Sequence, residues 1–592
     1  MLLLLSTAAA GLPSPDELRA RPDPMAAREV FKHLAAPAAP PSAAPPFAPP
    51  PAWDIEDYVL AVRIDPAART VVGRATITAA RLGPGDLLLH ADGPVISAVY
   101  VDGAAVTPTV VEDEVFIPVL GDTATLVVDW TYDGVRPNGI QWGREVVFSF
   151  HEPIGARTWL PVYDDPADKA SLTWEVTAPD GWVVAANGVL EATAAADAGW
   201  TTWRYVFDQP IPTYLMTVHL SDYDVSVTGG DIPVYTWAYP DRAAEAAETF
   251  GNTPEMLDYF SDLYAPYPFP SYGNAMAPFG GAMEHTTCVT FSDELVGDED
   301  GELVNVHELG HHWWGDDVTL GTWADIWLNE GFATYTEALW YEQEYGQEGL
   351  TVYAEYLTDA FFGWQSLEGR FPVYDPLYMW GGVVYDKGGM VVHMLRGVLG
   401  DDRFFAALSA YEAEHHLGTA VTTDLMDTFE ASSGEDLGWF FDQWVYGIGE
   451  PTYTWGWAIQ PDGAGGWQVD LSVSQDLTAF RMPMVARLTY ADGTTDDVSI
   501  VVEGEGAEAT VCLPASDERG APVTAELDPD RWVLRHENVE VAAEPGAITC
   551  DAAVPTSQDA VGCGCDGAAG AGGVLGVVVS GMLLASRRRR AR

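Results

Sequence analysis

The residues best suited to chemistry form one short pattern, His307-Glu308-Leu309-Gly310-His311. On a helix, positions i and i+4 lie on one face, so His307 and His311 can reach the same metal ion. Glu308 follows the first histidine and can accept a proton from water bound to that ion. With 12 histidines in 592 residues, the pattern is not expected by chance. It predicts a hydrolytic metal centre that still needs a third ligand.

Glu330 is the candidate for that ligand, because the gap after His311 accommodates a turn and a second helix. Two histidines and a glutamate leave one coordination position for water, which is the open arrangement of a catalytic zinc ion. Such an ion lowers the pKa of its water toward ~7 and polarises a carbonyl group. The ligand set favours one Zn²⁺ per chain, although another divalent ion would also fit. Asp325 could orient a ligating histidine or simply cap a helix.

Two motifs together resemble a known family. The pattern HELGH, followed by Glu330 within WLNEGFA, is similar to the M1 family of zinc aminopeptidases (gluzincins), and GGAMEH at 280–285 resembles that family's Gly-x-Met-Glu-Asn motif. The resemblance implies that Glu284 binds the substrate's free α-amino group, while His285 replaces the family's Asn and leaves the local turn geometry open. It also implies that the backbone beside Glu284 aligns the peptide like an added strand. The residues concerned are Gly281, Ala282 and Met283.

Two more residues take roles through the same resemblance. The stretch that starts at Glu152 resembles the family's Glu-Pro…Ala-Arg…Pro…Asp-x-Pro segment, which implies that Glu152 joins the amine anchor. Tyr385, in YDKG, resembles the tyrosine that hydrogen-bonds the oxyanion, and loss of such a donor typically costs about 3 kcal/mol. The structural alternatives are surface carboxylates for Glu152 and Glu284, and a core role for Tyr385. Two converging carboxylates repel each other unless a cation, such as an ammonium group, lies between them.

These motifs predict a zinc-dependent aminopeptidase, a hydrolase of the EC 3.4.11 type, that cleaves the N-terminal peptide bond with metal-activated water. Its expected partners are peptides with a free N-terminus, and the oligomeric state stays open. One alternative is another zinc hydrolase, either an endopeptidase or an epoxide hydrolase. A second alternative is a catalytically inactive peptide-binding protein of the cell surface.

The elements that must position these residues follow from hydrophobic periodicity. Short alternating or β-branched runs predict strands over residues 53–225 and again over residues 451–540. Residues 226–450 carry apolar positions near a 3.6-residue period, as helices do. We therefore expect a multidomain α+β protein with an N-terminal antiparallel β domain and a C-terminal β-sandwich. The M1 resemblance implies that the mostly helical part between them is a thermolysin-like catalytic domain.

Both ends of the chain have the composition of targeting or linking segments. Residues 1–20 start with an apolar run and small residues, as a signal peptide does, and residues 21–52 form a Pro/Ala-rich linker. A second linker is expected at 541–562. The tail, residues 563–592, contains Cys-Gly-Cys, an apolar membrane segment and an arginine cluster, which predicts a cytoplasmic end.

This tail resembles the surface-sorting tails of myxobacterial proteins, in which the segment is thought to be processed; a plain single-pass anchor is the alternative. Either arrangement predicts an exported protein, at the cell surface or anchored in the membrane, with its catalytic body outside the cytoplasm. Export would also allow Cys512 and Cys550 to pair.

The charge balance excludes one class of partner. The chain has 28 Lys and Arg against 88 Asp and Glu, a formal net charge of -60. Such a surface repels phosphates, so no nucleic-acid partner is expected. The excess charge is interpreted as a well-solvated surface of the kind suited to salt, or alternatively as a field that steers cationic peptides.

Overall fold

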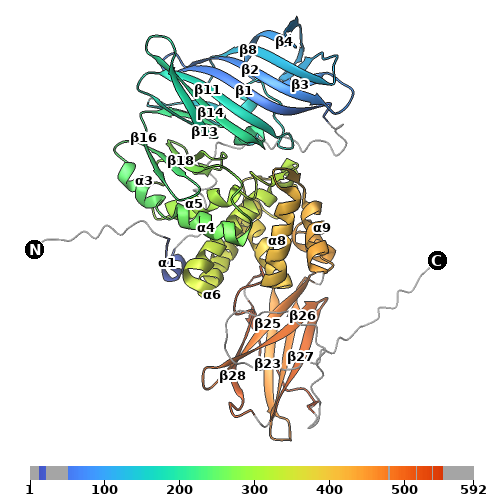
Figure 1. The fold of residues 1–592 in the computed structure, drawn as a ribbon. Coiled ribbons are helices and arrows are strands. Elements are labelled where there is room, and N and C mark those ends of the chain that lie inside the picture. Colours follow the sequence, from blue (N-terminus) through green and yellow to red (C-terminus); the bar gives the residue numbers. More distant parts are fainter. Residues whose placement is uncertain are drawn as a thin grey trace, which may run out of the picture.

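The computed structural model describes residues 12–21, 51–143, 145–477, 480–514, 517–536, 538–547 and 549–550. Figure 1 shows three parts in line: a β-rich N-terminal part, a mostly helical middle part and a second β-rich part. This arrangement confirms the expected multidomain α+β architecture.

An eight-stranded sheet dominates the N-terminal part. In spatial order its strands are β13 (Val189–Ala195), β14 (Trp200–Ile211), β11 (Ala170–Pro179), β1 (Trp53–Asp65), β2 (Thr70–Arg81), β8 (Thr123–Tyr132), β4 (Val95–Val101) and β5 (Ala104–Val106). β1 buries Tyr58, Leu60, Val62 and Ile64, every second residue, so one face of the sheet packs on the core. The strands of this sheet pair antiparallel, as expected, except that β1 and β11 run parallel. The parallel pair is possible because a long stretch of chain crosses over between them.

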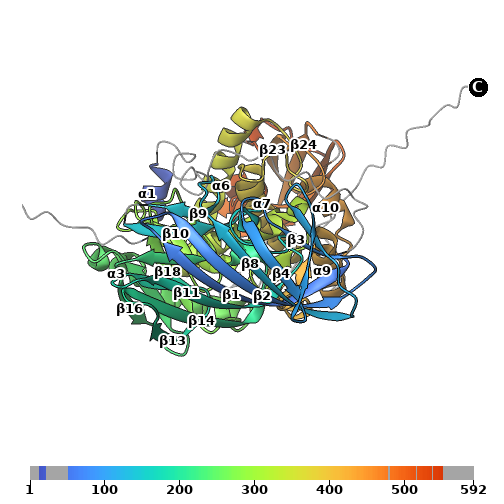
Figure 2. The ribbon, with the colours of Figure 1, turned by 90° about the horizontal axis from the view of Figure 1, so that it is seen from above.

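Two smaller sheets complete the N-terminal part. One orders β12 (Val183–Ala186), β15 (Val218–Ser221), β10 (Val146–Phe150) and β9 (Gly139–Trp142); the other orders β3 (Leu87–His90), β7 (Glu114–Ile117) and β6 (Thr109–Val111). Two 3-10 turns, η1 (Ala156–Thr158) and η2 (Thr213–Leu215), lie beside them. Seen from above, the large sheet lies over the helices of the middle part (Figure 2).

The middle part combines helices with a five-stranded sheet. Its strands, in spatial order, are β16 (Asp224–Thr228), β17 (Val234–Ala238), β18 (Tyr272–Ala277), β20 (Val289–Ser292) and β19 (Ala282–Met283). Its helices are α3 (Ala243–Thr249), α4 (Thr253–Leu263), α5 (Gly301–His311), α6 (Trp327–Glu368), α7 (Gly388–Leu399), α8 (Asp401–His415), α9 (Thr422–Ser433) and α10 (Gly438–Trp444). The 3-10 turn η3 (Trp323–Asp325), the π-helix η4 (Val383–Lys387) and a two-stranded sheet of β21 (Thr319–Leu320) and β22 (Thr419–Ala420) join them.

The long helix α6 folds back on itself at Gly346, whose φ of 65° is not helical. Glycine adopts this left-handed conformation without the steric cost that a side chain would bring. Just beyond the turn, a Cβ on Gly349 would lie 2.2 Å from the backbone oxygen of Tyr341, so the two halves of α6 approach closely there. The rings of Tyr341 and Tyr353 then pack 4.8 Å apart across the hairpin.

The C-terminal part contains seven strands in the order β28 (Pro522–Leu527), β25 (Arg481–Tyr490), β26 (Thr495–Glu503), β27 (Gly506–Leu513), β24 (Trp467–Gln475), β23 (Tyr453–Pro461) and β29 (Val539–Glu540). β26 and β27 pair at a single position, Glu503 with Gly506, so the sheet is divided there into two halves. β26 buries alternate residues, as the facing halves of a β-sandwich require.

Two expected boundaries change. The sequence predicts a linker over residues 541–562, but within its described residues, 541–547 and 549–550, Val541 donates to the backbone of Trp455 and Thr549 to the side chain of Gln468. Cys550 forms a disulfide with Cys512. These residues therefore lie along the C-terminal strands, because that segment has hydrogen-bond partners that composition alone does not reveal.

The second change concerns the N-terminus, where α1 (Pro15–Arg19) packs on α6. Leu18 is buried, Tyr345 donates a hydrogen bond to the backbone oxygen of Leu12 (3.1 Å), and Arg21 pairs with Asp300 at 2.6 Å. Residues 12–21 are thus part of the folded body, although they fall inside the expected signal-like segment 1–20 and the start of the linker 21–52.

Among the helices of the described ranges, none is both long and apolar enough to cross a bilayer. The membrane segment predicted within residues 563–592 lies outside these ranges, as do residues 1–11 and most of the Pro/Ala-rich linker.

Candidate metal centre and peptide site

Two helices bring the three predicted metal ligands together. His307 and His311 lie one turn apart on α5, which is buried along its whole length, and Glu330 lies in the first turn of α6. The Nε2 atoms of the histidines are 3.0 Å apart. Glu330 Oε2 lies 3.3 Å from His307 Nε2 and 3.4 Å from His311 Nε2. The three donor atoms therefore surround one point.

The other nitrogen of each imidazole is engaged elsewhere. His307 Nδ1 lies 2.9 Å from Glu337 Oε1, and His311 Nδ1 lies 3.2 Å from the backbone oxygen of Trp314. Both partners accept hydrogen bonds, so each imidazole carries its proton on Nδ1 and directs the lone pair of Nε2 to the shared point. Tyr353 in turn donates to Glu337. With a carboxylate beside them, the donors suit Zn²⁺ in number, kind and orientation.

Glu337 and Tyr353 were not predicted from the sequence. The available signal was the spacing of Glu337, seven residues beyond Glu330 and hence on the same face of α6. Asp325 does not orient a ligating histidine but accepts hydrogen bonds from Thr322 and from the backbone and hydroxyl of Thr422 at the start of α9. It therefore fixes a helix end, the second of the two roles that the sequence allows.

Burial alone would raise the pKa of Glu330, but the two histidines lower it to about 2, so this residue remains a carboxylate. The pKa of Glu308 moves in the opposite direction. Burial raises the pKa of Glu308 to about 8, against the opposing effect of His307 and His311. Its Oε2 atom has no hydrogen-bond partner among the described residues. A carboxyl group that titrates near neutral pH can both take up and return a proton.

Nine of the predicted site residues line one cavity: Glu152, Ala282, Met283, Glu284, His307, Glu308, His311, Glu330 and Tyr385. Gly281 does not line it; this glycine lies one position before β19, and its carbonyl accepts a hydrogen bond from Ser292. β19 is the outermost strand of its sheet in the described part of the chain, so a peptide could pair along its free side.

Glu152 and Glu284 converge on the metal ligands from two different parts of the chain. One carboxylate oxygen from each of them and one from Glu330 lie within 4.8 Å of one another. Both side chains are buried, and burial raises the pKa of each; for Glu152 the next cause is the charge of Glu284. Glu152 Oε1 and Glu284 Oε1 make no hydrogen bond within the described ranges. Such a pair attracts a cation.

His285 keeps the turn after Glu284 in place. Its Nδ1 atom lies 2.8 Å from Thr290 Oγ1 on β20, and its backbone oxygen accepts a hydrogen bond from Cys288. The replacement of the family's Asn by histidine is therefore accommodated by a hydrogen bond to the neighbouring strand.

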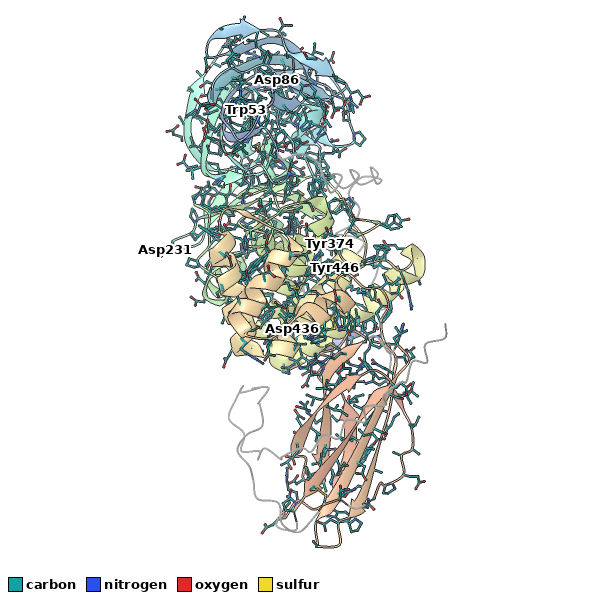
Figure 3. All side chains as sticks on the ribbon, turned by 90° about the vertical axis from the view of Figure 1, so that its right-hand side faces the viewer. Trp53, Asp86, Asp231, Tyr374, Asp436 and Tyr446 are labelled. Atoms are coloured by element: carbon teal, nitrogen blue, oxygen red, sulfur yellow. A yellow bond between two sulfur atoms is a disulfide. The ribbon has the colours of Figure 1, made fainter. Side chains whose placement is uncertain are left out.

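Tyr385 enters the cavity from a π-helical turn, a rare element that often occurs at functional sites. Its ring stacks on that of His307 with centroids 6.0 Å apart. Burial, followed by the charges of Glu330 and Glu152, raises the pKa of Tyr385 well above its usual value, so the hydroxyl keeps its proton and can donate. The chain before this turn is held by Tyr374, whose ring contacts Tyr446 at 5.3 Å (Figure 3).

Comparison with known proteins relates two segments of the chain to one peptidase family. Residues 248–444 match the peptidase family M1 domain, and residues 132–215 match the peptidase M1 N-terminal domain. The matched M1 domain includes α5, α6 and the π-helix with Tyr385.

Similar proteins agree with this assignment. Aminopeptidase 2 of Candida albicans is 25% identical over 69% of this chain and 48% of its own length. An M1 zinc metallopeptidase mutant from Deinococcus radiodurans, bound to a Tyr-Ser-Ala substrate, is 26% identical, with a TM-score of 0.59 over 67% of this chain and 94% of its own. Aminopeptidase A of Legionella pneumophila, in complex with aspartic acid, shares the fold at 17% identity, with a TM-score of 0.71 over 85% of this chain and 61% of its own. The chain spans less than half the length of the first curated relatives it matches, 48% and 34%.

Proposed function

We propose that this protein is a zinc-dependent aminopeptidase that removes the N-terminal residue of peptides. The observation that carries the proposal is the position of Glu152 and Glu284 beside Glu330, with one oxygen of each within 4.8 Å of the others. An ammonium group held by the first two carboxylates places the first peptide bond of a substrate next to the metal ligands. The similarity to a metallopeptidase that binds a Tyr-Ser-Ala substrate supports peptides as substrates.

Each residue of the cavity has a distinct task in this proposal. When bound by His307, His311 and Glu330, Zn²⁺ supplies a Lewis acid that activates water and polarises the peptide carbonyl. Glu308 takes the proton of the attacking water and delivers it to the leaving amine.

Tyr385 donates a hydrogen bond to the oxyanion that develops on the carbonyl. Glu284 and Glu152 hold the α-ammonium group, and the free side of β19 aligns the peptide backbone.

A pair of substrates that differ only in the α-amino group tests the proposal. We expect hydrolysis of an aminoacyl fluorogenic amide, inhibition by a zinc chelator, and no measurable hydrolysis of the N-acetylated amide. Equal cleavage of both amides would favour an endopeptidase. Absence of hydrolysis across a panel of aminoacyl amides, with zinc bound, would favour an inactive peptide-binding protein.

We infer that the enzyme works outside the cytoplasm, at the cell surface or anchored in the membrane. The disulfide between Cys512 and Cys550 supports export, since disulfides persist mainly in oxidising compartments. The apolar segment and arginine cluster within residues 563–592 support attachment to a membrane, and their resemblance to sorting tails supports processing there. Protease treatment of intact cells tests this: removal of the aminopeptidase activity is expected, and full protection would contradict it.

A further inference from the structure

A second group of metal-binding side chains lies outside the cavity. It consists of Asp317, in the loop after α5, Glu412, near the end of α8, and His416, directly after α8. His416 Nδ1 lies 3.0 Å from Asp317 Oδ1 and 3.2 Å from Glu412 Oε1. One donor atom from each of the three residues lies within 4.8 Å of the other two.

The two distances from His416 Nδ1, 3.0 Å and 3.2 Å, fall in the range found among the candidate zinc ligands. His307, His311 and Glu330 place their donor atoms 3.0 to 3.4 Å apart. Atoms ~2.1 Å from one zinc ion in a tetrahedron lie roughly 3.4 Å from one another. Divalent ions of the zinc class accept a ligand set of two carboxylates and one imidazole. They also accept the reverse set of two imidazoles and one carboxylate.

The electrostatics also favour a cation. The side chain of Asp317 is fully buried and that of Glu412 is 10% exposed, so water screens neither carboxylate well. The backbone N–H of Leu417 donates to Asp317 Oδ1, but an amide carries no net charge. The proton on His416 Nδ1 can serve only one of the two carboxylates well, whereas a divalent ion at that point serves both.

The nearby cation of Lys169 is engaged by other groups. The ammonium group of Lys169 lies on the backbone side of Asp317, where it donates to the carbonyl oxygens of Asp316, Asp317 and Gly418. It therefore does not pair with the carboxylate of Asp317 in these contacts. His416 is 48% exposed, so an ion bound there can be reached from solvent and can complete its coordination with water.

We propose that Asp317, Glu412 and His416 form a second divalent-cation site that takes an ion of the zinc class. The ion ties the end of α8 to the loop after α5, where Lys169 attaches the N-terminal part. Its role is structural, because these residues do not line the candidate catalytic cavity.

Metal content of the full chain tests the proposal. After loading with ZnSO₄ and dialysis, mass spectrometry is expected to find a second equivalent of Zn²⁺, which Glu412→Gln and His416→Ala each lose. His415→Ala is the matched control, since His415 also ends α8 but contacts the backbone oxygen of Thr419 at 3.2 Å. This control is expected to retain both equivalents.

A variant without the predicted catalytic ligands separates the two sites. His307→Ala combined with His311→Ala is expected to keep one equivalent of Zn²⁺, and added Zn²⁺ is expected to raise its Tm. Adding Glu412→Gln to that background should abolish both effects, while circular dichroism verifies folding. A single equivalent in the unaltered chain, or a second one that persists in both Glu412→Gln and His416→Ala, would overturn the proposal.

Discussion

Glu337, which lies two helical turns beyond Glu330 on α6, accepts a hydrogen bond from His307 at 2.9 Å. One helix therefore supplies both a candidate metal ligand and the residue that orients another ligand. Tyr353, from the second half of α6, donates to the same carboxylate. His307, Glu337 and Tyr353 therefore form a buried chain of hydrogen bonds. It begins at the candidate metal centre and ends on the second half of α6.

Glu337→Gln and Tyr353→Phe are expected to weaken zinc binding. Loss of a group that orients a ligating histidine typically lowers metal affinity about 10- to 100-fold. Competition with a chromophoric chelator measures the zinc dissociation constant. Glu344→Gln, an exposed position on the same helix, is the control and should leave the constant unchanged. Unaltered affinity in both test variants would mean that Glu337 does not position His307.

Glu308→Gln is expected to retain zinc and to lose nearly all turnover. The amide keeps the size of the side chain but cannot accept a proton, and general-base catalysis contributes roughly 10² to 10⁴ in rate. Metal analysis and kcat for an aminoacyl amide, measured on one preparation, check both halves of the expectation. A variant with normal kcat would remove Glu308 from the mechanism.

Glu284→Gln is expected to impair recognition of the α-ammonium group. Loss of one partner of a buried charge pair costs about 2 to 5 kcal/mol, or roughly 30-fold or more in kcat/KM. The KM for a free aminoacyl amide should rise, because the α-ammonium group loses a charged partner. Glu152→Gln should act in the same direction. If KM and kcat/KM of both variants match those of the unaltered protein, the two carboxylates do not bind the amine.

The stability of the protein should fall in mild acid, partly through His393. Burial, followed by the charge of Arg396, lowers the pKa of His393 to about 3, while its Nε2 lies 3.1 Å from the backbone oxygen of Arg531. In the unfolded chain its pKa is ~6.5, so between pH 6.5 and 3 the unfolded state binds the extra proton. Stability that is present above pH 6.5 is therefore lost as the pH falls.

Through His393, the free energy of unfolding should be about 3 kcal/mol lower at pH 4.5 than at pH 7. His393→Phe keeps a ring against Trp532, which stacks on His393 at 4.5 Å, but cannot be protonated. Thermal unfolding of both proteins at pH 7 and pH 4.5 provides the measurement. The variant should lose less stability between the two pH values; an identical loss would show that His393 takes up its proton at the same pH in the folded and unfolded states.

The sequence indicated the three candidate metal ligands because their geometry is local or anchored by a motif, and the structure brings the three side chains together. His307 and His311 are one helical turn apart, and a helix fixes their relation without any tertiary information. Glu330 could be placed because its surrounding motif is specific. The confirmed α+β architecture followed from the periodicity of strands and helices in the same way.

Tertiary contacts explain what the sequence did not predict. Tyr353 reaches Glu337 only because α6 turns back at Gly346, and a helical periodicity continues through that glycine. The parallel pairing of β1 and β11 depends on a crossover that no local pattern specifies. Residues such as Arg21 and Thr549 are fixed in the folded body by Asp300 and Gln468, which are far away in the sequence.

The hairpin in α6 restricts how this stretch of sequence can change in length. In a straight helix, Glu337 and Tyr353 would lie about 24 Å apart, yet here they are hydrogen-bonded. Each residue inserted between them within a helical half would rotate the residues beyond it by ~100° and turn Tyr353 away. Relatives that keep this support for the metal ligand should therefore tolerate substitutions between the two residues, but few insertions or deletions.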